Sequence, residues 1–135
     1  MFRVVLDTNV LVSALWKKPS NSTRILDLMV LGQLTPFYNG HIIYEYKEVL
    51  NRPKFRFSPV DIENLLDIIR KDGMSVLALR SGLDFIDEDD RMFYEVAQTA
   101  KAFLITGNVR HYPTEPHIIS PTAFLEIYIP SLSVY

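Results

Sequence analysis

The chain contains no cysteine, and this absence removes several classes of chemistry at once. Without cysteine among its 135 residues, the protein can form no disulfide, no thiolate nucleophile and no cysteine-based zinc site. The composition is compatible with a reducing compartment, and we expect a cytoplasmic protein.

Long apolar runs and a strong excess of charge are also missing. No run approaches the ~18 apolar residues of a membrane-spanning helix. The first residues, MFRVVLDTN, lack the regions of a secretory signal, so we expect no membrane partner. The formal net charge is only −2. A nucleic-acid partner would therefore have to bind a local basic patch.

Glycine and histidine are scarce, with five and three residues respectively. The glycine-rich signature of a phosphate-binding loop is absent. His41, His111 and His117 do not show the spacing of metal ligands. His111 could contact a scissile phosphate or donate a proton, and the alternative is a surface or helix-capping role.

What the sequence does contain is an alternation of short apolar strands and amphipathic helices. Strands are expected at residues 2–6, 34–38, 74–79, 102–106 and 118–119, and helices at 10–15, 23–31, 41–51, 59–72, 90–100 and 120–128. Pro36 should lie near an end or an edge of the sheet, and Pro130 should close the last helix. This order predicts a three-layer α/β/α sandwich with a central parallel sheet, formed by residues 1–135 as a single domain.

The most informative stretch is FRVVLDTNVLVSAL, residues 2–15. Phe2 to Leu6 has the composition of a strand buried on both faces. Asp7 follows directly, at the position that faces the ligand crevice in open parallel sheets. The alternative is that Asp7 or Thr8 simply caps the next helix.

Further side-chain oxygens are expected beside Asp7. The fourth strand ends in Thr106 and Gly107, which places Asn108 at its carboxyl end, and adjacent parallel strands would bring Asn108 close to Asp7. The flanking helices would carry in Glu45 and Asp90. A pocket of carboxylate and amide oxygens suits Mg²⁺ or Mn²⁺, which would offset the repulsion among the acids and could activate water near a phosphoryl group.

Four stretches together resemble the PIN-domain family. They are LDTNVLVSAL, IIYEYKEVLNRPKF, DEDDRMFYEVAQTAKAFLITGN and IISPTAFLE, in this order over nearly the whole chain. The resemblance is strongest to the bacterial toxin components of toxin–antitoxin systems, the VapC-like ribonucleases. It implies a metal-dependent endoribonuclease that hydrolyses RNA phosphodiester bonds, with an antitoxin as partner and a homodimer as the assembly.

The resemblance also implies roles for individual residues. Asp7 matches the first acid of the family, Glu45 the acid on a helix, and Asp90 the third acid, so that these three would be catalytic and would hold the metal. Asn108 stands where many members carry a fourth acid. Asn9 and Thr106 resemble the supporting polar residues.

Two assignments have rivals, and one position departs from the family pattern. Asp89 competes with Asp90, which keeps the family spacing to Asn108. Glu48 competes with Glu45, which lies nearer the apolar face of its helix. Because Asn108 is uncharged, affinity for metal should be lower than in a four-acid site, and a catalytically weak or inactive RNA- or protein-binding module is the alternative. A dehalogenase-like phosphatase would also place Asp after the first strand, but Asn9 stands where its second Asp is needed.

Several basic residues could contact RNA. The segment 52–57 carries Arg52, Lys54 and Arg56 interleaved with two phenylalanines, a pattern that could bind phosphates and stack bases. The alternative is a solvated loop whose aromatic residues anchor it. Arg91 and Arg110 flank the expected pocket, although Arg91 could equally pair with neighbouring acids.

Overall fold

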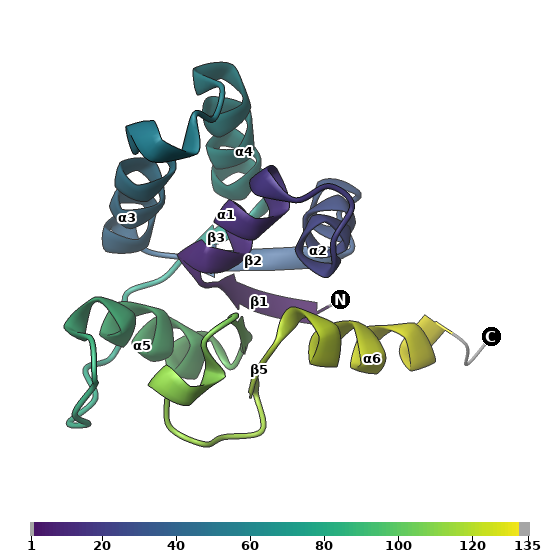
Figure 1. The fold of residues 1–135 in the computed structure, drawn as a ribbon. Coiled ribbons are helices and arrows are strands. Elements are labelled where there is room, and N and C mark those ends of the chain that lie inside the picture. The colour runs from purple at the N-terminus through teal and green to yellow at the C-terminus, as the bar shows by residue number, and fades with distance from the viewer. Residues whose placement is uncertain (1, 133–135) are drawn as a thin grey trace.

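The computed structural model describes residues 2–132, which form one five-stranded parallel sheet covered by helices (Figure 1). The strand order is β3-β2-β1-β4-β5, and every strand pairing is parallel. The strands are β1 (Phe2–Leu6), β2 (Leu34–Tyr38), β3 (Met74–Ser75), β4 (Phe103–Ile105) and β5 (Ile118–Ile119). The predicted α/β class and parallel sheet are confirmed.

Within residues 2–132, five α-helices and three short 3₁₀ turns connect the strands, and a sixth α-helix follows the last strand. The helices are α1 (Thr8–Trp16), α2 (Asn21–Val30), α3 (Gly40–Leu50), α4 (Pro59–Asp72), α5 (Arg91–Ala100) and α6 (Pro121–Leu132). The 3₁₀ turns are η1 (Pro53–Phe55), η2 (Glu88–Asp90) and η3 (Val109–His111). Figure 1 shows α1 to α4 on one side of the sheet and α5 and α6 on the other, as expected for a three-layer sandwich.

The central strand β1 explains why the sheet needs helices on both faces. Its residues Val4, Val5 and Leu6 are at most 1% exposed, although successive side chains point to opposite faces. Each face of β1 must therefore be covered by helices, which agrees with its continuous apolar sequence.

The strand order also locates the crevice of the fold. From β1 the chain proceeds to β2 and β3 on one side, and it then returns past β1 to form β4 and β5 on the other. The order therefore reverses between β1 and β4, where Leu6 lies opposite Ile105. Connections that leave neighbouring strands in different directions open a crevice at their carboxyl ends. Asp7 and Thr106 stand at this point.

The prediction that Pro36 lies near an end or an edge is wrong, because β2 lies between β3 and β1 and Pro36 is paired with Val4 at its centre. The Tyr38 carbonyl accepts a hydrogen bond from the Val76 N–H. Alternate residues of a strand direct their backbone groups to the same side, so the Pro36 nitrogen points toward β3. Since β3 begins only opposite Phe37, the missing N–H removes no bond between the strands.

Two predicted boundaries also differ from the structure. The third strand is expected to reach residue 79 but ends at Ser75, because its partner β2 ends at Tyr38 and the chain there turns into α3. Leu77 is consequently 95% exposed. The last helix continues past Pro130 to Leu132, where a proline so near the end interrupts few backbone hydrogen bonds.

Candidate functional site

Asp7 is buried at the carboxyl end of β1, and its side chain is held by residues from the far end of the chain. It is 6% exposed. The Thr106 hydroxyl donates a hydrogen bond to Asp7 Oδ2 at 2.8 Å, and the Tyr112 hydroxyl donates to the same oxygen at 2.9 Å. Asp7 occupies the N-cap position of α1 but makes no side-chain capping bond. Helix capping therefore does not explain this acid.

Thr106 is the centre of a hydrogen-bond network that fixes the ends of β1 and β4 together. Its hydroxyl donates to Asp7 and accepts a hydrogen bond from the Asn108 N–H at 2.9 Å and another from Asn9 Nδ2 at 3.4 Å. The Asn9 side-chain oxygen in turn accepts the Gly107 N–H at 2.8 Å. The predicted supporting residues Asn9 and Thr106 thus adjoin Asp7, and they hold its carboxylate in one orientation.

Asp90 is the second acid near the carboxyl end of β1, and its carboxylate does not cap the helix that follows it. It occupies the N-cap position of α5 without making a side-chain capping bond. Its side chain is 15% exposed, and His111 Nδ1 lies 3.5 Å from Asp90 Oδ2. This separation is too long for a strong hydrogen bond, and within the described residues the buried Oδ2 atom has no hydrogen-bond partner. A buried carboxylate oxygen without a donor is a site where a cation would be stabilised.

The electrostatics of Asp7 and Asp90 show that the two carboxylates interact. Burial raises the pKa of Asp7, although the hydrogen bonds from Thr106 and Tyr112 oppose this effect. Burial, followed by the charges of Asp7 and Asp87, raises the pKa of Asp90 to about 6. Both acids therefore disfavour the ionised state in the absence of a counter-charge.

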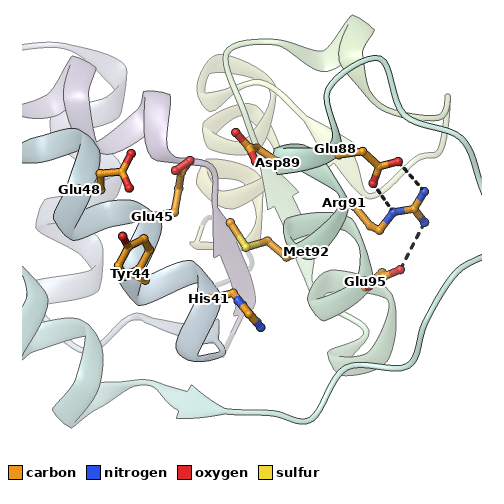
Figure 2. Close-up of a pocket in the computed structure, with 9 residues that line it drawn as sticks. All are labelled: His41, Tyr44, Glu45, Glu48, Glu88, Asp89, Arg91, Met92 and Glu95. Atoms are coloured by element: carbon orange, nitrogen blue, oxygen red, sulfur yellow. Dashed lines mark hydrogen bonds and ion pairs between the residues drawn. The ribbon is translucent and has the colours of Figure 1, made fainter.

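Glu45 lies on α3 in a neighbouring pocket. This pocket has a volume of about 340 Å³, and Figure 2 shows Glu45 and Asp89 among its lining residues, on α3 and just before α5. Burial raises the pKa of Glu45, and the charges of Asp89 and Glu48 raise it further, while Arg52 opposes them. Asp7 contributes the weakest effect. Glu45 thus interacts weakly with Asp7, but its strongest charged neighbour is Asp89, the rival of Asp90.

The exposure of the rival acids distinguishes them from the preferred ones. Glu48 is exposed and pairs with Arg52 at 3.7 Å, whereas Glu45 is half-buried. Asp89 is exposed, whereas Asp90 is half-buried. The assignment of Glu45 and Asp90 remains a prediction, and their lower exposure supports it.

The acids do not converge into a complete metal cage. Among residues 2–132, no group of three histidine, aspartate or glutamate side chains is arranged to hold a metal ion. Asp7 and Asp90 form a pair, Glu45 lies in the adjoining pocket and Asn108 is exposed at the rim. The oxygen-only donors and the unpartnered Asp90 Oδ2 fit a hard divalent cation, which would have to complete its coordination with water or substrate.

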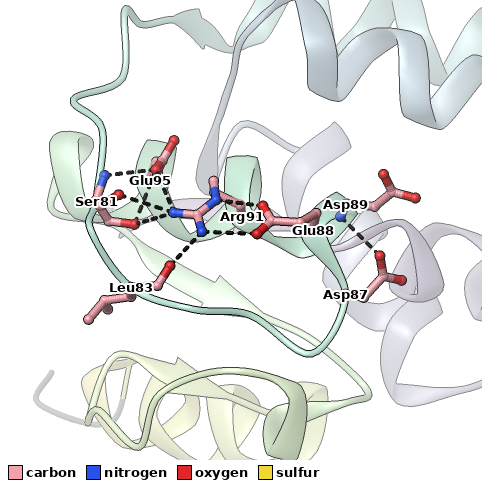
Figure 3. Close-up of polar contacts among 7 residues, drawn as sticks. All are labelled: Ser81, Leu83, Asp87, Glu88, Asp89, Arg91 and Glu95. Carbon is pink, nitrogen blue, oxygen red and sulfur yellow. Dashed lines mark hydrogen bonds and ion pairs between the residues drawn. The ribbon is translucent and has the colours of Figure 1, made fainter.

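Arg91 lines the pocket of Glu45, but its guanidinium is engaged in hydrogen bonds to the loop that precedes α5 (Figure 3). Its guanidinium donates to Glu88 Oε2 at 2.7 Å and to the Ser81 carbonyl at 3.1 Å, and it also donates to the Leu83 carbonyl. It lies 3.6 Å from Glu95 Oε2 as well. The alternative of pairing with neighbouring acids is therefore the one that the structure shows.

The other predicted RNA contacts lie on the surface. Lys54 and Arg56 are exposed in the loop after α3, and Arg110 is exposed in η3. His111 lies beside Asp90 with its side chain 45% exposed. Their contact with RNA stays a prediction.

Two tyrosines near the site were not anticipated from the sequence. Tyr112 donates to Asp7, and the buried Tyr46 hydroxyl donates to the Leu6 carbonyl at 2.5 Å. Tyr46 directly follows Glu45, and its position on the apolar face of α3 gives a weak signal. Tyr112 lies in the connection between β4 and β5, and nothing in the sequence marks it.

Comparison with known proteins identifies the family of this chain. The sequence profile of the family described as PIN domain matches residues 3–110. The chain belongs to the PIN-domain family. An uncharacterized protein of Methanocaldococcus jannaschii, MJ1680, is 30% identical over 109 residues, which cover 78% of this chain and 70% of that protein.

A solved structure agrees with the PIN fold. The crystal structure of VapBC2 from Rickettsia felis, bound to a DNA fragment from its promoter, contains a chain that matches with a TM-score of 0.54 at 20% identity. The match covers 88% of this chain and 97% of that chain. At this identity, the likeness establishes the fold alone.

Membership of the PIN-domain family sets the class of chemistry. PIN domains are generally nucleases that use divalent metals, so the phosphatase alternative is set aside.

No helix in residues 2–132 is long and apolar enough to cross a membrane.

Proposed function

We propose that this PIN domain is a metal-dependent endoribonuclease that hydrolyses RNA phosphodiester bonds with Mg²⁺ or Mn²⁺. The observation that carries the proposal is the buried carboxylate of Asp7 beside the half-buried Asp90, whose Oδ2 atom has no hydrogen-bond partner among the described residues. Such a pair is costly without a cation, and its position between β1 and β4 is where the fold binds ligands.

The residues of the proposed site have different roles. Asp7 and Asp90 would hold the cation, with Glu45 and Asn108 acting directly or through water. Thr106 and Tyr112 keep the Asp7 carboxylate in place through bonds of 2.8 and 2.9 Å. A bound divalent cation supplies a water of lowered pKa and stabilises negative charge on the phosphoryl oxygens.

His111 is placed to assist at the leaving group. Its side chain is 45% exposed beside Asp90, so a phosphodiester bound at the acids can reach it. An imidazole N–H in this position can donate a proton to a departing oxygen.

We further propose that the protein is the toxin of a toxin–antitoxin pair that acts in the cytoplasm as a homodimer. The fold likeness to the VapBC2 structure and the toxin-like sequence pattern around Asn108 support this role. Co-purification of a small protein encoded in the adjacent reading frame, with inhibition of cleavage by that protein, would test the partner. Light scattering would test the dimer.

The decisive experiment compares wild type and Asp7→Asn on single-stranded RNA with Mg²⁺ or Mn²⁺. We expect cleavage to fall at least about 100-fold in the variant, because the change removes a ligand charge and weakens the cation site. Circular dichroism would confirm that the variant is folded. Equal cleavage by the two proteins would remove Asp7 from the mechanism.

A second candidate is a PIN-fold binding module with little or no catalysis. It is favoured by the absence of a three-ligand group in the described residues and by the uncharged Asn108. Calorimetric titration with Mn²⁺ separates the candidates, since no heat of binding at millimolar Mn²⁺ would support the module. If metal binds weakly, Asn108→Asp should strengthen binding by restoring a fourth charge.

A further inference from the structure

Two segments far apart in the sequence form a cluster of three aromatic rings, of which Trp16 is exposed and the two phenylalanines are half-buried. Trp16, the last residue of α1, lies 5.3 Å from Phe55 between ring centroids, with the rings at 76°. Phe55 lies 5.3 Å from Phe57, with the rings nearly parallel at 7°. We call Trp16, Phe55 and Phe57 the Trp16 platform.

The platform is anchored at one end and open at the other. Phe57 packs against the hydrophobic core, which fixes the stack to the body of the protein. Trp16 is 63% exposed, so much of its ring is not covered by the described residues. An exposed tryptophan supported by a second ring is a flat surface on which another planar group can stack.

Five cations lie in the two segments that carry the platform. Lys17 and Lys18 follow Trp16, and the second segment adds Arg52, Lys54 and Arg56, while neither 16–18 nor 52–57 contains an acid. These are five of the fourteen lysines and arginines of a chain with net charge −2. Within the described residues, only Arg52 of the five forms an ion pair, with Glu48 at 3.7 Å. Lys54 Nζ lies 5.1 Å from the Phe55 ring centroid. This is the local basic patch that a nucleic-acid partner would need.

The platform is connected to the acidic site by two structural elements. Helix α1 begins next to Asp7 and ends at Trp16, and at 1.5 Å per residue its nine residues span about 13 Å. Arg52 pairs at 3.7 Å with Glu48, which lines the same pocket as Glu45, and it lowers the pKa of Glu45, so its positive charge borders the acidic pocket. A single strand can therefore contact both regions at once.

We propose that the Trp16 platform stacks a base of single-stranded RNA while the surrounding lysines and arginines bind its phosphates. The inference rests on the proposed function, since it assigns the substrate strand a path beyond the acids. Aromatic rings with interleaved cations are the recognition chemistry of single-stranded nucleic acids. Protein interfaces are instead depleted in lysine, and three of these five cations are lysines.

The chain offers a direct probe, because Trp16 is its one tryptophan. The full-length Asp7→Asn protein is titrated in EDTA with oligoadenylate, which is not cleaved under these conditions, while tryptophan fluorescence is recorded. We expect saturable quenching as bases stack on Trp16. Inorganic polyphosphate of the same charge provides the control, and it should leave the fluorescence nearly unchanged.

Matched variants then test the two components separately, with binding measured by the anisotropy of labelled oligoadenylate. Trp16→Ala should weaken binding by about 5- to 100-fold, the loss typical of one base stack. Lys54→Gln should reduce the slope of log affinity against log salt by about 0.7. Lys71→Gln, an exposed change in the last turn of α4, should leave both quantities unchanged. Circular dichroism checks the fold of each variant.

Several outcomes would overturn the inference. Equal quenching by polyphosphate would mean that charge alone is recognised. Unchanged binding by Trp16→Ala would exclude stacking, and loss of self-association in that variant would identify a protein interface instead. Because binding is measured without metal or turnover, quenching without any cleavage by wild type would count against the nuclease alone. Cleavage by wild type without quenching would count against the platform alone.

Discussion

The two ends of helix α1 lie in opposite chemical surroundings. At its start, Asp7 is buried and receives hydrogen bonds from Thr106 and Tyr112. At its end, Trp16 is 63% exposed and contacts another ring. The first end is assembled by directed bonds between distant parts of the chain, and the second by ring contacts with cations nearby.

This difference teaches how stability and function are distributed along one helix. The acidic end carries two carboxylates whose burial raises their pKa values. At neutral pH these carboxylates therefore lower the free energy of unfolding of the metal-free protein. The aromatic end contains no buried charge, and its exposed ring contributes little to the core. Substitutions at the two ends should therefore change activity and stability in different ratios.

The largest effect is expected for Asp90→Asn. RNA cleavage with Mn²⁺ should fall at least about 100-fold, because the cation site loses a charge. The free energy of unfolding of the metal-free protein at pH 7 should instead rise by about 1–3 kcal/mol, because a repelled and buried charge is removed. Denaturant unfolding in EDTA, alongside the cleavage assay, measures both.

The stability gain of Asp90→Asn over wild type should increase as the pH rises. The pKa of Asp90 is about 6 in the folded protein, above the ordinary value of 3.8 for this side chain, so the folded state binds the proton more tightly than the unfolded state. Its contribution to stability is present in full below about pH 4 and is lost as the pH rises through about 6. The difference between Asp90→Asn and wild type should grow over this interval. A difference independent of pH would contradict the raised pKa.

Thr106→Val should have the next largest effect. The change keeps the shape of the side chain but removes the donor to Asp7 and the acceptor for the Asn108 N–H. Cleavage should fall by about 10- to 100-fold, and the free energy of unfolding by about 1–3 kcal/mol. Thr99→Val is the matched control, since its hydroxyl accepts one exposed N–H, that of Leu79. Equal losses of activity in both variants would show that the network does not position Asp7.

Glu45→Gln and Glu48→Gln form a pair that decides between the two acids of α3. Glu45 is half-buried with a raised pKa, whereas Glu48 is exposed and bound to Arg52. We expect Glu45→Gln to reduce cleavage by about 10-fold and Glu48→Gln to change it little. The reverse result would transfer the assignment to Glu48.

The sequence was a good guide to the scaffold and to part of the site. Strands such as Phe2–Leu6 are read from local composition, and Asp7, Asn9 and Thr106 were expected at neighbouring strand ends, where the structure connects them by hydrogen bonds. These features depend on patterns within a few residues and on the rules of parallel sheets.

The features that the sequence did not reveal depend on contacts between distant segments. The Tyr112 bond to Asp7 joins residues 105 positions apart, and the contact of Trp16 with Phe55 joins the end of α1 to the 3₁₀ turn η1. Pro36 was misplaced for a similar reason, because its tolerance depends on where the neighbouring β3 begins. No local periodicity encodes such relations.

The smallest effect is expected for Trp16→Leu on stability. The free energy of unfolding should fall by less than about 1.5 kcal/mol, because an exposed aromatic pair contributes little beyond its contact area. Denaturant unfolding beside wild type measures this. A loss of several kcal/mol would show that Trp16 belongs to the core rather than to an open surface.

A helix is a rod of constant length, and α1 joins the acids to the platform without a hinge. If an RNA base rests at one end while the scissile bond lies at the other, every cut would fall the same number of nucleotides from the stacked base. Changing the identity of that base would then move or suppress the cut. The length of the nine-residue helix α1 would thus set the distance between the stacked base and the cleavage position.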